Sequence, residues 1–269
     1  MHARAPRVSQ RAAALSLVGL CVASVAIVAA LLVPSPSPGL PAQPWAVAGT
    51  LVVANLPVAR CPTSYGIPSA RDVDLPRFVR AVLSRALAPT VSVFTDGLGT
   101  LDVVAPTAWG CTALDGVAGS STLIVYPPGE QRPSWGHVTA VRSGIVATQT
   151  GGCAGCSIET ACPLFAAAAH QYAVIYRSSC RHAAEERRTD VSGSTVLFVD
   201  PPGVLGSGEP SGGALAAYGA MLWHLPGARH PTAWRVTCTL PSADQPLCVL
   251  SVRAFLARHG VAAPSGAVA

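Results

Sequence analysis

Residues 151–162 read GGCAGCSIETAC, and this short stretch holds three cysteines, Cys153, Cys156 and Cys162. Cysteines at such close spacing are typical of a metal site, of a redox-active pair, or of disulfides that stabilise an exported domain. The choice depends on the compartment in which the chain folds, because disulfides form and persist outside the cytoplasm. The rest of the sequence therefore has to be searched first for signs of export.

An uncharged segment near the N-terminus is such a sign. Residues 12–33, AAALSLVGLCVASVAIVAALLV, number 22, and a helix of that length measures about 33 Å against a hydrocarbon core of about 30 Å. Arg4, Arg7 and Arg11 precede it, so residues 1–11 are expected in the cytoplasm and the C-terminal side outside. We predict an uncleaved single-pass anchor in the cell membrane; cleavage as a signal peptide, followed by secretion, is the alternative.

The chain beyond the anchor divides by composition. Residues 34–49 are rich in proline and predict a stiff spacer, residues 50–260 predict one exported domain, and residues 261–269 predict a flexible tail. All 18 basic residues are arginines, and the absence of lysine excludes the usual P-loop, Schiff-base and kinase sites.

The charge balance argues against one class of partner. Fifteen arginines follow the anchor and face 13 acidic residues, a net charge of +2, which provides no electrostatic basis for nucleic-acid binding. The densest group of charges is interpreted as a solvated surface; it comprises Arg177, Arg181, Glu185, Glu186, Arg187 and Arg188.

Export also accounts for the cysteines. Of the nine, Cys21 lies in the apolar segment and is interpreted as a membrane-buried side chain. The other eight form an even set in an exported domain, which predicts structural disulfides. Proximity in the sequence suggests the pairs Cys61–Cys111, Cys153–Cys156, Cys162–Cys180 and Cys238–Cys248.

The hydrophobic pattern predicts a single, disulfide-stabilised α+β domain with a mainly antiparallel sheet and segregated helices. Strands are expected at residues 50–54, 91–95, 100–106, 121–127, 137–150 (as one or two strands), 194–200, 216–225 and 233–241, and a long loop at 201–213. Helices are expected at residues 74–88, at 157–172 with a disturbance at Pro163, and at 246–260 with Gly260 as the stop.

The C-x-x-C pair of Cys153 and Cys156 permits two further interpretations. In thiol–disulfide exchange, a helix N-terminus stabilises the first thiolate, and here a possible strand precedes the pair and a predicted helix follows it. The repeated βα units and the aromatic residue that such catalysts carry before the pair are missing from the sequence. A zinc site of Cys153, Cys156, Cys162 and His170 is the third interpretation, which export disfavours.

Several short motifs together resemble a family of exported actinobacterial proteins that is classed as a domain of unknown function. They are CPTSYGIP at 61–68, APTAWGC at 105–111, YPPG at 126–129, GGCAGC with ACPLF at 151–165, DPPGV with PSGG at 200–213, and TCTLP at 237–241. The similarity spans roughly residues 58–258. It implies a cell-envelope location and a cysteine-stabilised domain, and it transfers no activity.

These observations predict a non-catalytic extracytoplasmic domain, tethered to the membrane by its N-terminal helix, that binds an unknown extracellular partner. No catalytic, cofactor-binding or metal-binding residue is assigned. The alternative is a thiol–disulfide oxidoreductase that uses Cys153 and Cys156. An exposed pair at the start of a helix, beside a groove, would favour this alternative, and a buried disulfide would favour the binding domain.

Overall fold

The computed structural model describes residue 45 and residues 49–66, 72–116, 119–130, 143–180, 185–208, 213–224 and 231–262. All of these belong to one compact unit, Pro41–Ala269. The predicted anchor at 12–33, with Cys21, lies outside the described residues, as do most of the spacer and of the tail. Within the described part of the chain, no helix combines the length and the apolar character needed to span a membrane.

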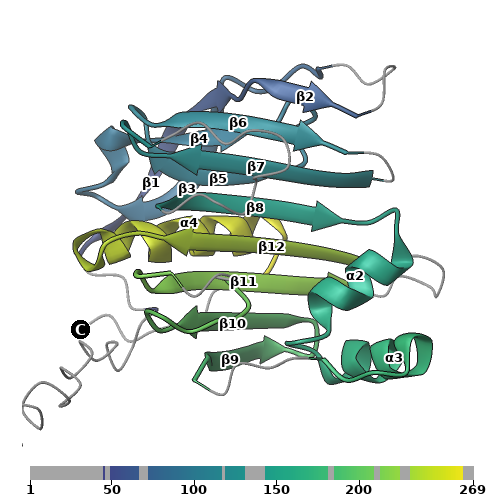
Figure 1. Cartoon of the computed structure of the whole chain (residues 1–269). Coiled ribbons are helices and arrows are strands. Elements are labelled where there is room, and N and C mark those ends of the chain that lie inside the picture. Colours follow the sequence, from purple (N-terminus) through teal and green to yellow (C-terminus); the bar gives the residue numbers. More distant parts are fainter. Residues whose placement is uncertain are drawn as a thin grey trace, which may run out of the picture. The chain divides into compact units, whose positions relative to one another are not determined.

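The larger of two β-sheets has eight strands in the order β2-β6-β7-β8-β12-β11-β10-β9 (Figure 1). Adjacent strands are antiparallel except β2 and β6, which run parallel. Its strands are β2 (Thr63–Tyr65), β6 (Gly110–Asp115), β7 (Ser120–Tyr126), β8 (Gly144–Thr150), β9 (Arg187–Ser192), β10 (Thr195–Asp200), β11 (Ala217–His224) and β12 (Thr232–Thr239).

The smaller sheet has four strands in the order β3-β1-β4-β5, so that β3 lies at its edge. Only the β1–β4 pairing is parallel. Its strands are β1 (Leu51–Arg60), β3 (Phe78–Ser84), β4 (Val91–Thr95) and β5 (Asp102–Pro106). Three α-helices complete the described part: α2 (Ala154–Ala161), α3 (Ala166–Tyr176) and α4 (Gln245–Arg258), with short 3₁₀ turns η1 (Ala88–Thr90) and η3 (Ser242–Asp244). The expected α+β class with mainly antiparallel pairing is confirmed, although the strands form two sheets.

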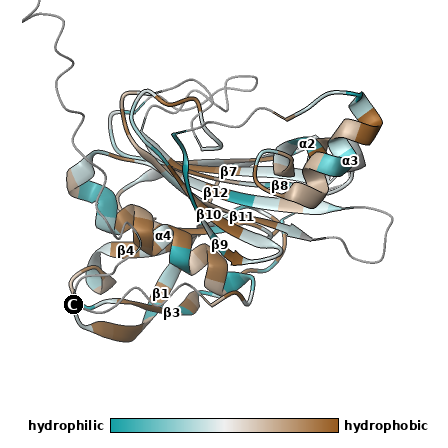
Figure 2. Cartoon of the chain, turned by 90° about the horizontal axis from the view of Figure 1, so that it is seen from below, coloured by the Kyte–Doolittle hydropathy of each residue, from teal (hydrophilic) through white to brown (hydrophobic). Residues whose placement is uncertain are grey.

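The helices cover opposite faces of the eight-stranded sheet (Figure 2). Ala233 of β12 belongs to an apolar cluster with Ala161 of α2 and Phe165 at the start of α3. Cys238 of the same strand is instead bonded to Cys248 of α4. Since side chains alternate along a strand, an odd and an even position point to opposite faces. The α2–α3 pair therefore packs on one face of the sheet and α4 on the other, so the predicted segregation of the helices is wrong: α4 lies between the two sheets.

α4 is the central element of the core. It contacts β11 and β12 of the larger sheet and β3 and β5 of the smaller one. Eight of its 14 residues are buried, and they are distributed around the helix rather than along one stripe. A helix that is apolar all round is stable only when it is enclosed, and α4 is enclosed by the two sheets. Pro246 in its first turn and Gly260 at φ +70° agree with the predicted start and stop.

The eight cysteines form four disulfides, and the partners are those that sequence proximity suggested. Cys61–Cys111 joins the end of β1, in the smaller sheet, to β6 in the larger one, and Cys238–Cys248 joins β12 to α4. Cys162–Cys180 ties the end of α2 to the segment that follows α3. These three bonds connect separate elements, whereas Cys153–Cys156 closes a loop inside the first turn of α2.

The predicted helix at 74–88 is wrong, because residues 78–84 form strand β3. Phe78 and Val82, which would share a helical face with Leu83, are 62% and 63% exposed, whereas Leu83 is buried. This alternation has the period of a strand. β3 pairs with β1 from Leu51↔Ser84 to Pro57↔Phe78, so tertiary pairing overrides the local helical pattern.

The other predicted elements differ mainly in extent. The first strand runs to Arg60, and the helix disturbed at Pro163 is two helices, α2 and α3. Strands β2, β6 and β9 were not predicted. Of the segment 137–150, residues 144–150 form β8, and residues 137–142 lie outside the described residues.

Candidate functional site

A cavity of about 510 Å³ opens between edge strand β3 and the second half of α4. We call it the β3–α4 groove. From β3 it is lined by Val79, Ala81, Val82 and Leu83, and from the helical side by Leu250, Ala254, Ala257 and Val261. Its volume lies within the range of small-molecule sites, about 300–1,000 Å³, and its lining is mainly apolar, as such sites usually are.

The groove has a buried floor and a more open end. Leu83 of β3 and Leu250 of α4 are buried at the floor of the groove, whereas Ala254 is only half-buried. Farther along, Ala257 is exposed and Val261 is half-buried, so the two elements leave an open space between them. Small alanine side chains at positions 81, 254 and 257 keep this space unfilled.

Charged side chains at the rim of the groove are three arginines and one aspartate. Arg258 pairs with Asp102 at 2.9 Å, and Arg253 donates to the carbonyl oxygen of Trp45 at 3.3 Å. Arg80 of β3 is exposed. Burial raises the pKa of Asp102 above its usual value, against the opposing effects of a hydrogen bond from Thr95 and the charge of Arg258. With Asp102 paired, the rim presents an excess of positive charge.

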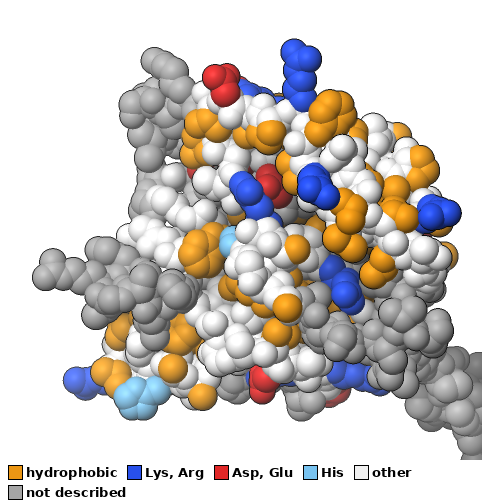
Figure 3. All heavy atoms as spheres, turned by 180° about the vertical axis from the view of Figure 1, so that it is seen from behind, with side chains coloured by type: hydrophobic (Ala, Val, Ile, Leu, Met, Phe, Trp, Pro, Cys, Tyr) orange, Lys and Arg blue, Asp and Glu red, His pale blue; other side chains and the backbone are white. Residues whose placement is uncertain are grey.

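An exposed apolar surface adjoins the groove. Leu51 and Val53 of β1 are 40% and 59% exposed, and Val53 pairs across the strands with Val82. Leu51 and Val82 also line the groove, so the outer surface and the cavity are continuous at the edge of the sheet. Seen from behind, apolar side chains are interspersed with arginines on this side of the molecule (Figure 3). Contiguous apolar surface of this kind marks interaction sites in soluble domains.

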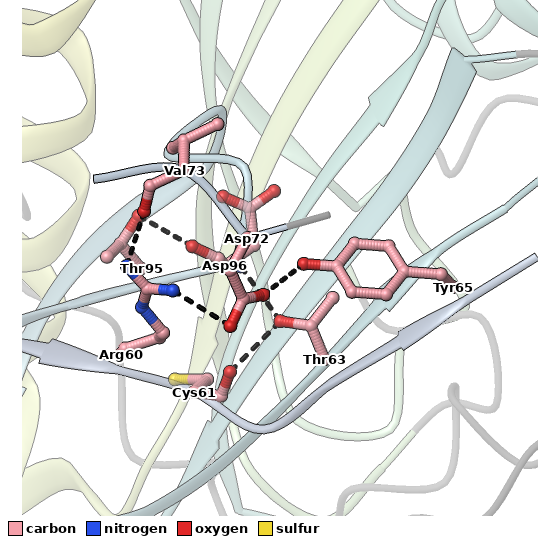
Figure 4. Close-up of polar contacts among 9 residues, drawn as sticks. Arg60, Cys61, Thr63, Tyr65, Asp72, Val73, Thr95 and Asp96 are labelled. Carbon is pink, nitrogen blue, oxygen red and sulfur yellow. Dashed lines mark hydrogen bonds and ion pairs between the residues drawn. The ribbon is translucent and has the colours of Figure 1, made fainter. Parts of the chain in front are cut away.

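A polar cluster fixes the turn between β4 and β5 (Figure 4). Asp72 pairs with Arg60 at 2.8 Å and accepts a hydrogen bond from Tyr65. Thr63 accepts a hydrogen bond from the Gly97 amide at 2.8 Å. A Cβ atom at Gly97 would overlap the Tyr65 hydroxyl, so only glycine fits this close approach.

The ionisation of this cluster is set by its hydrogen bonds. Partial burial and the hydrogen bond to Asp72 raise the pKa of Tyr65 to about 12. Hydrogen bonds from Tyr65 and Arg60 lower the pKa of Asp72 below its usual value. Neither group is then poised to exchange a proton near neutral pH. We interpret the cluster as structural, since Val73 also donates its amide to Gly97 in the turn.

The C-x-x-C pair lies at the start of α2. Cys153 is the N-cap residue, and the Cys156 amide donates to its Sγ at 3.2 Å. Both cysteines are exposed, which is one of the conditions that favour thiol–disulfide exchange. The β3–α4 groove is lined by none of the residues of α2, so it is not a substrate site for this pair.

The zinc interpretation is not supported by the pairing. Cys153 and Cys156 are bonded to each other, and Cys162 is bonded to Cys180. Disulfide sulfurs do not act as the thiolate ligands that a zinc site requires. Among the described residues, no group of three or more His, Cys, Asp or Glu side chains has the arrangement of a metal site.

The solvated-surface interpretation of residues 177–188 is wrong for Glu186, which is only 8% exposed. Its carboxylate pairs with Arg188 at 2.7 Å, accepts the Ser207 amide at 2.7 Å and shares a hydrogen bond with the buried Asp200. Burial disfavours its charge, but these hydrogen bonds outweigh burial and lower the pKa of Glu186. Arg235 of β12 donates to the Ser207 carbonyl at 3.0 Å.

This buried carboxyl pair holds the loop after β10. Gly208 donates its amide to Asp200 at 2.7 Å, and a Cβ atom at Gly206 would overlap the same carboxylate. Asp200 is 0% exposed, so the pair offers no surface to a substrate. The one sequence signal for it was the glycine-rich stretch that follows Asp200.

Comparison of the chain with protein-family models, with curated proteins and with solved structures finds no match. The resemblance to exported actinobacterial proteins therefore stays a prediction.

Proposed function

We propose that the domain is an extracytoplasmic binding domain that holds an anionic single-chain amphiphile, such as a fatty acid, in the β3–α4 groove. The observation that supports this proposal is the combination of an apolar floor with an arginine rim. The floor would take the hydrocarbon chain, and burial of apolar surface favours binding by about 25 cal/mol per Å². The rim would take the charged head group.

Charge complementarity selects an anionic ligand over a neutral one. Arg80 is exposed beside the apolar lining, and its guanidinium can donate two parallel hydrogen bonds to a carboxylate. Arg253 and Arg258 add positive charge on the helical side. An extended peptide that pairs with edge strand β3 is the competing occupant, because edge strands offer unpaired backbone groups.

The proposed location suits such a ligand. If residues 12–33 anchor the chain in the cell membrane, the spacer at 34–49 leads directly to β1, whose Leu51 lines the groove. A short tether of this kind would keep the groove near a lipid surface. A reporter fused after Ala269 should therefore be active outside the cytoplasm; activity only in the cytoplasm would contradict this topology.

Photo-crosslinking of the full chain in lipid nanodiscs tests the binding proposal. A long-chain fatty acid with a diazirine in its chain should label peptides from β3 and from the second half of α4, and excess unlabelled fatty acid should suppress this label. Labelling at residues 12–33 alone would contradict the proposal. If the protein binds an extended apolar peptide and the fatty-acid probe does not label the groove, the site belongs to a peptide instead.

The head group is tested separately. The methyl ester of the same probe should label the groove at least tenfold less than the acid. Arg80→Gln should reduce labelling by the acid, whereas Arg85→Gln, which changes an exposed arginine outside the lining, should leave it unchanged. Equal labelling by the acid and the ester would still support binding of the hydrocarbon chain in the groove, but it would contradict recognition of an anionic head group.

A further inference from the structure

The four disulfides differ in exposure. Cys61, Cys162, Cys238 and Cys248 are between 0% and 2% exposed, so three of the bonds have at least one sulfur in the core. In the Cys153–Cys156 bond both residues are exposed. A thiolate from another molecule must approach a disulfide sulfur directly. Among the four bonds, Cys153–Cys156 offers the most open approach.

The same bond also has the least structural function. It closes a loop of only three residues in sequence separation, and a short loop restricts the unfolded chain little. Other hydrogen bonds also hold the start of α2. The Ser157 hydroxyl donates to the carbonyl oxygen of Thr150 in β8 at 2.7 Å, and the Ser157 amide donates to the carbonyl oxygen of Cys153 at 3.1 Å. Reduction of Cys153–Cys156 should therefore leave α2 in place.

The helix start stabilises one of the two thiolates over the other. Cys153 is the N-cap, and its Sγ already accepts the Cys156 amide. After reduction this amide and the positive end of the helix dipole would stabilise negative charge on Cys153. Cys156 lies inside the first turn and has no such amide donor to its own sulfur among the hydrogen bonds of the described residues.

An exposed aromatic side chain lies beside the pair. Val174, Ile175 and Tyr176, at the end of α3, are 68%, 54% and 45% exposed. The Tyr176 hydroxyl reaches the first turn of α2, since a Cβ atom at Gly155 would lie 2.5 Å from it. An apolar residue of an unfolded polypeptide could pack on Tyr176 with its cysteine next to the disulfide.

We infer that Cys153–Cys156 is a redox-active disulfide that oxidises dithiols in unfolded exported polypeptides, an activity separate from ligand binding in the β3–α4 groove. A substrate thiolate attacks Sγ of Cys153; a mixed disulfide forms, the Cys153–Cys156 bond breaks, and Cys156 leaves as a thiolate that takes up a proton. The second substrate thiolate then attacks the substrate sulfur of the mixed disulfide. The substrate disulfide forms, and Cys153 leaves as a thiolate at the helix start. The substrate loses two electrons, and the protein disulfide becomes a dithiol.

Stoichiometric exchange with the oxidised full chain in detergent tests this inference. The probe is a synthetic peptide with two cysteines flanked by leucines, at neutral pH and without other oxidants. One peptide disulfide should form per protein, and differential alkylation should place the new thiols at Cys153 and Cys156. The double variant Cys153→Ser with Cys156→Ser should form none. Peptide oxidation by this variant at the wild-type level, or new thiols at the other six cysteines, would overturn the inference.

Two further variants separate exchange chemistry from simple accessibility. Cys156→Ser, which leaves Cys153 at the helix start, should form a mixed disulfide with an activated peptide at least tenfold faster than Cys153→Ser. Tyr176→Ser should slow oxidation of the leucine-flanked peptide and leave that of a serine-flanked peptide unchanged. Equal rates for the two single-cysteine variants would show that the helix start does not activate Cys153, and would overturn the assignment of a redox-active site.

Discussion

α4 and α3 lie on opposite faces of the eight-stranded sheet, and their side chains are used differently. α4 buries eight of its 14 residues between two sheets and is bonded to β12 through a fully buried disulfide. α3 buries Ala168 and exposes Val174, Ile175 and Tyr176 at its end. α4 is therefore part of what makes the domain fold. The apolar end of α3 and the disulfide next to it add little to folding, and they are free to interact with other molecules.

The largest expected effect contrasts the two helices directly. Phe255→Ala should lower the free energy of unfolding by about 3–5 kcal/mol, because Phe255 is 1% exposed and its loss leaves a cavity. Val174→Ala on α3 should change it by less than about 0.5 kcal/mol. Denaturant titration of the full-length variants measures both values. A comparable loss in Val174→Ala would show that the end of α3 is part of the core.

The disulfides should show an intermediate effect. Replacing Cys162 and Cys180 by serine should cost about 3 kcal/mol, since their bond closes a loop of 18 residues in sequence separation. The same change at Cys153 and Cys156 should cost clearly less. Thermal melting of the two double variants gives this comparison, and an unchanged melting temperature for the Cys162 and Cys180 variant would refute the structural role of that bond.

Thiol labelling of the unfolded, unreduced wild type should find no free cysteine among the eight.

A smaller effect concerns the end of α4. His259 packs against Phe255 and Trp234, and burial, with a contribution from Arg258, lowers the pKa of His259. The unfolded chain then binds a proton more readily than the folded one, so stability should fall as the pH drops below about 6.5, the ordinary value for histidine. Melting temperatures between pH 7.5 and 5, compared with those of His259→Gln, should show a weaker decline in the variant. Equal declines would assign the pH dependence to other groups.

Local signals in the sequence were sufficient for much of this fold. The apolar runs at 91–95 and 100–106 predicted β4 and β5, and the pattern at 246–260 with Gly260 as the stop predicted α4. The disulfide partners followed sequence proximity. In each case the information lies within a few residues or follows from a simple preference for nearby partners.

The features that escaped prediction depend on distant partners. β3 has a helical apolar pattern and becomes a strand only because β1 pairs with it. Glu186 is buried only because Asp200 lies next to it in the folded chain. The β3–α4 groove could not be predicted from the sequence for the same reason, since residues 79–83 come close to residues 250–261 only in the folded domain.

The most direct test of ligand binding in the groove fills the groove from its mouth. Ala257→Trp places a large side chain in the β3–α4 groove at an exposed position of α4, and Ala167→Trp places the same side chain at an exposed position of α3. Titration of the full-length proteins with a fluorescent long-chain fatty acid should show an affinity at least tenfold lower for Ala257→Trp and unchanged for Ala167→Trp, with both variants as stable as the wild type. Equal affinities for the wild type and Ala257→Trp would contradict binding in this groove.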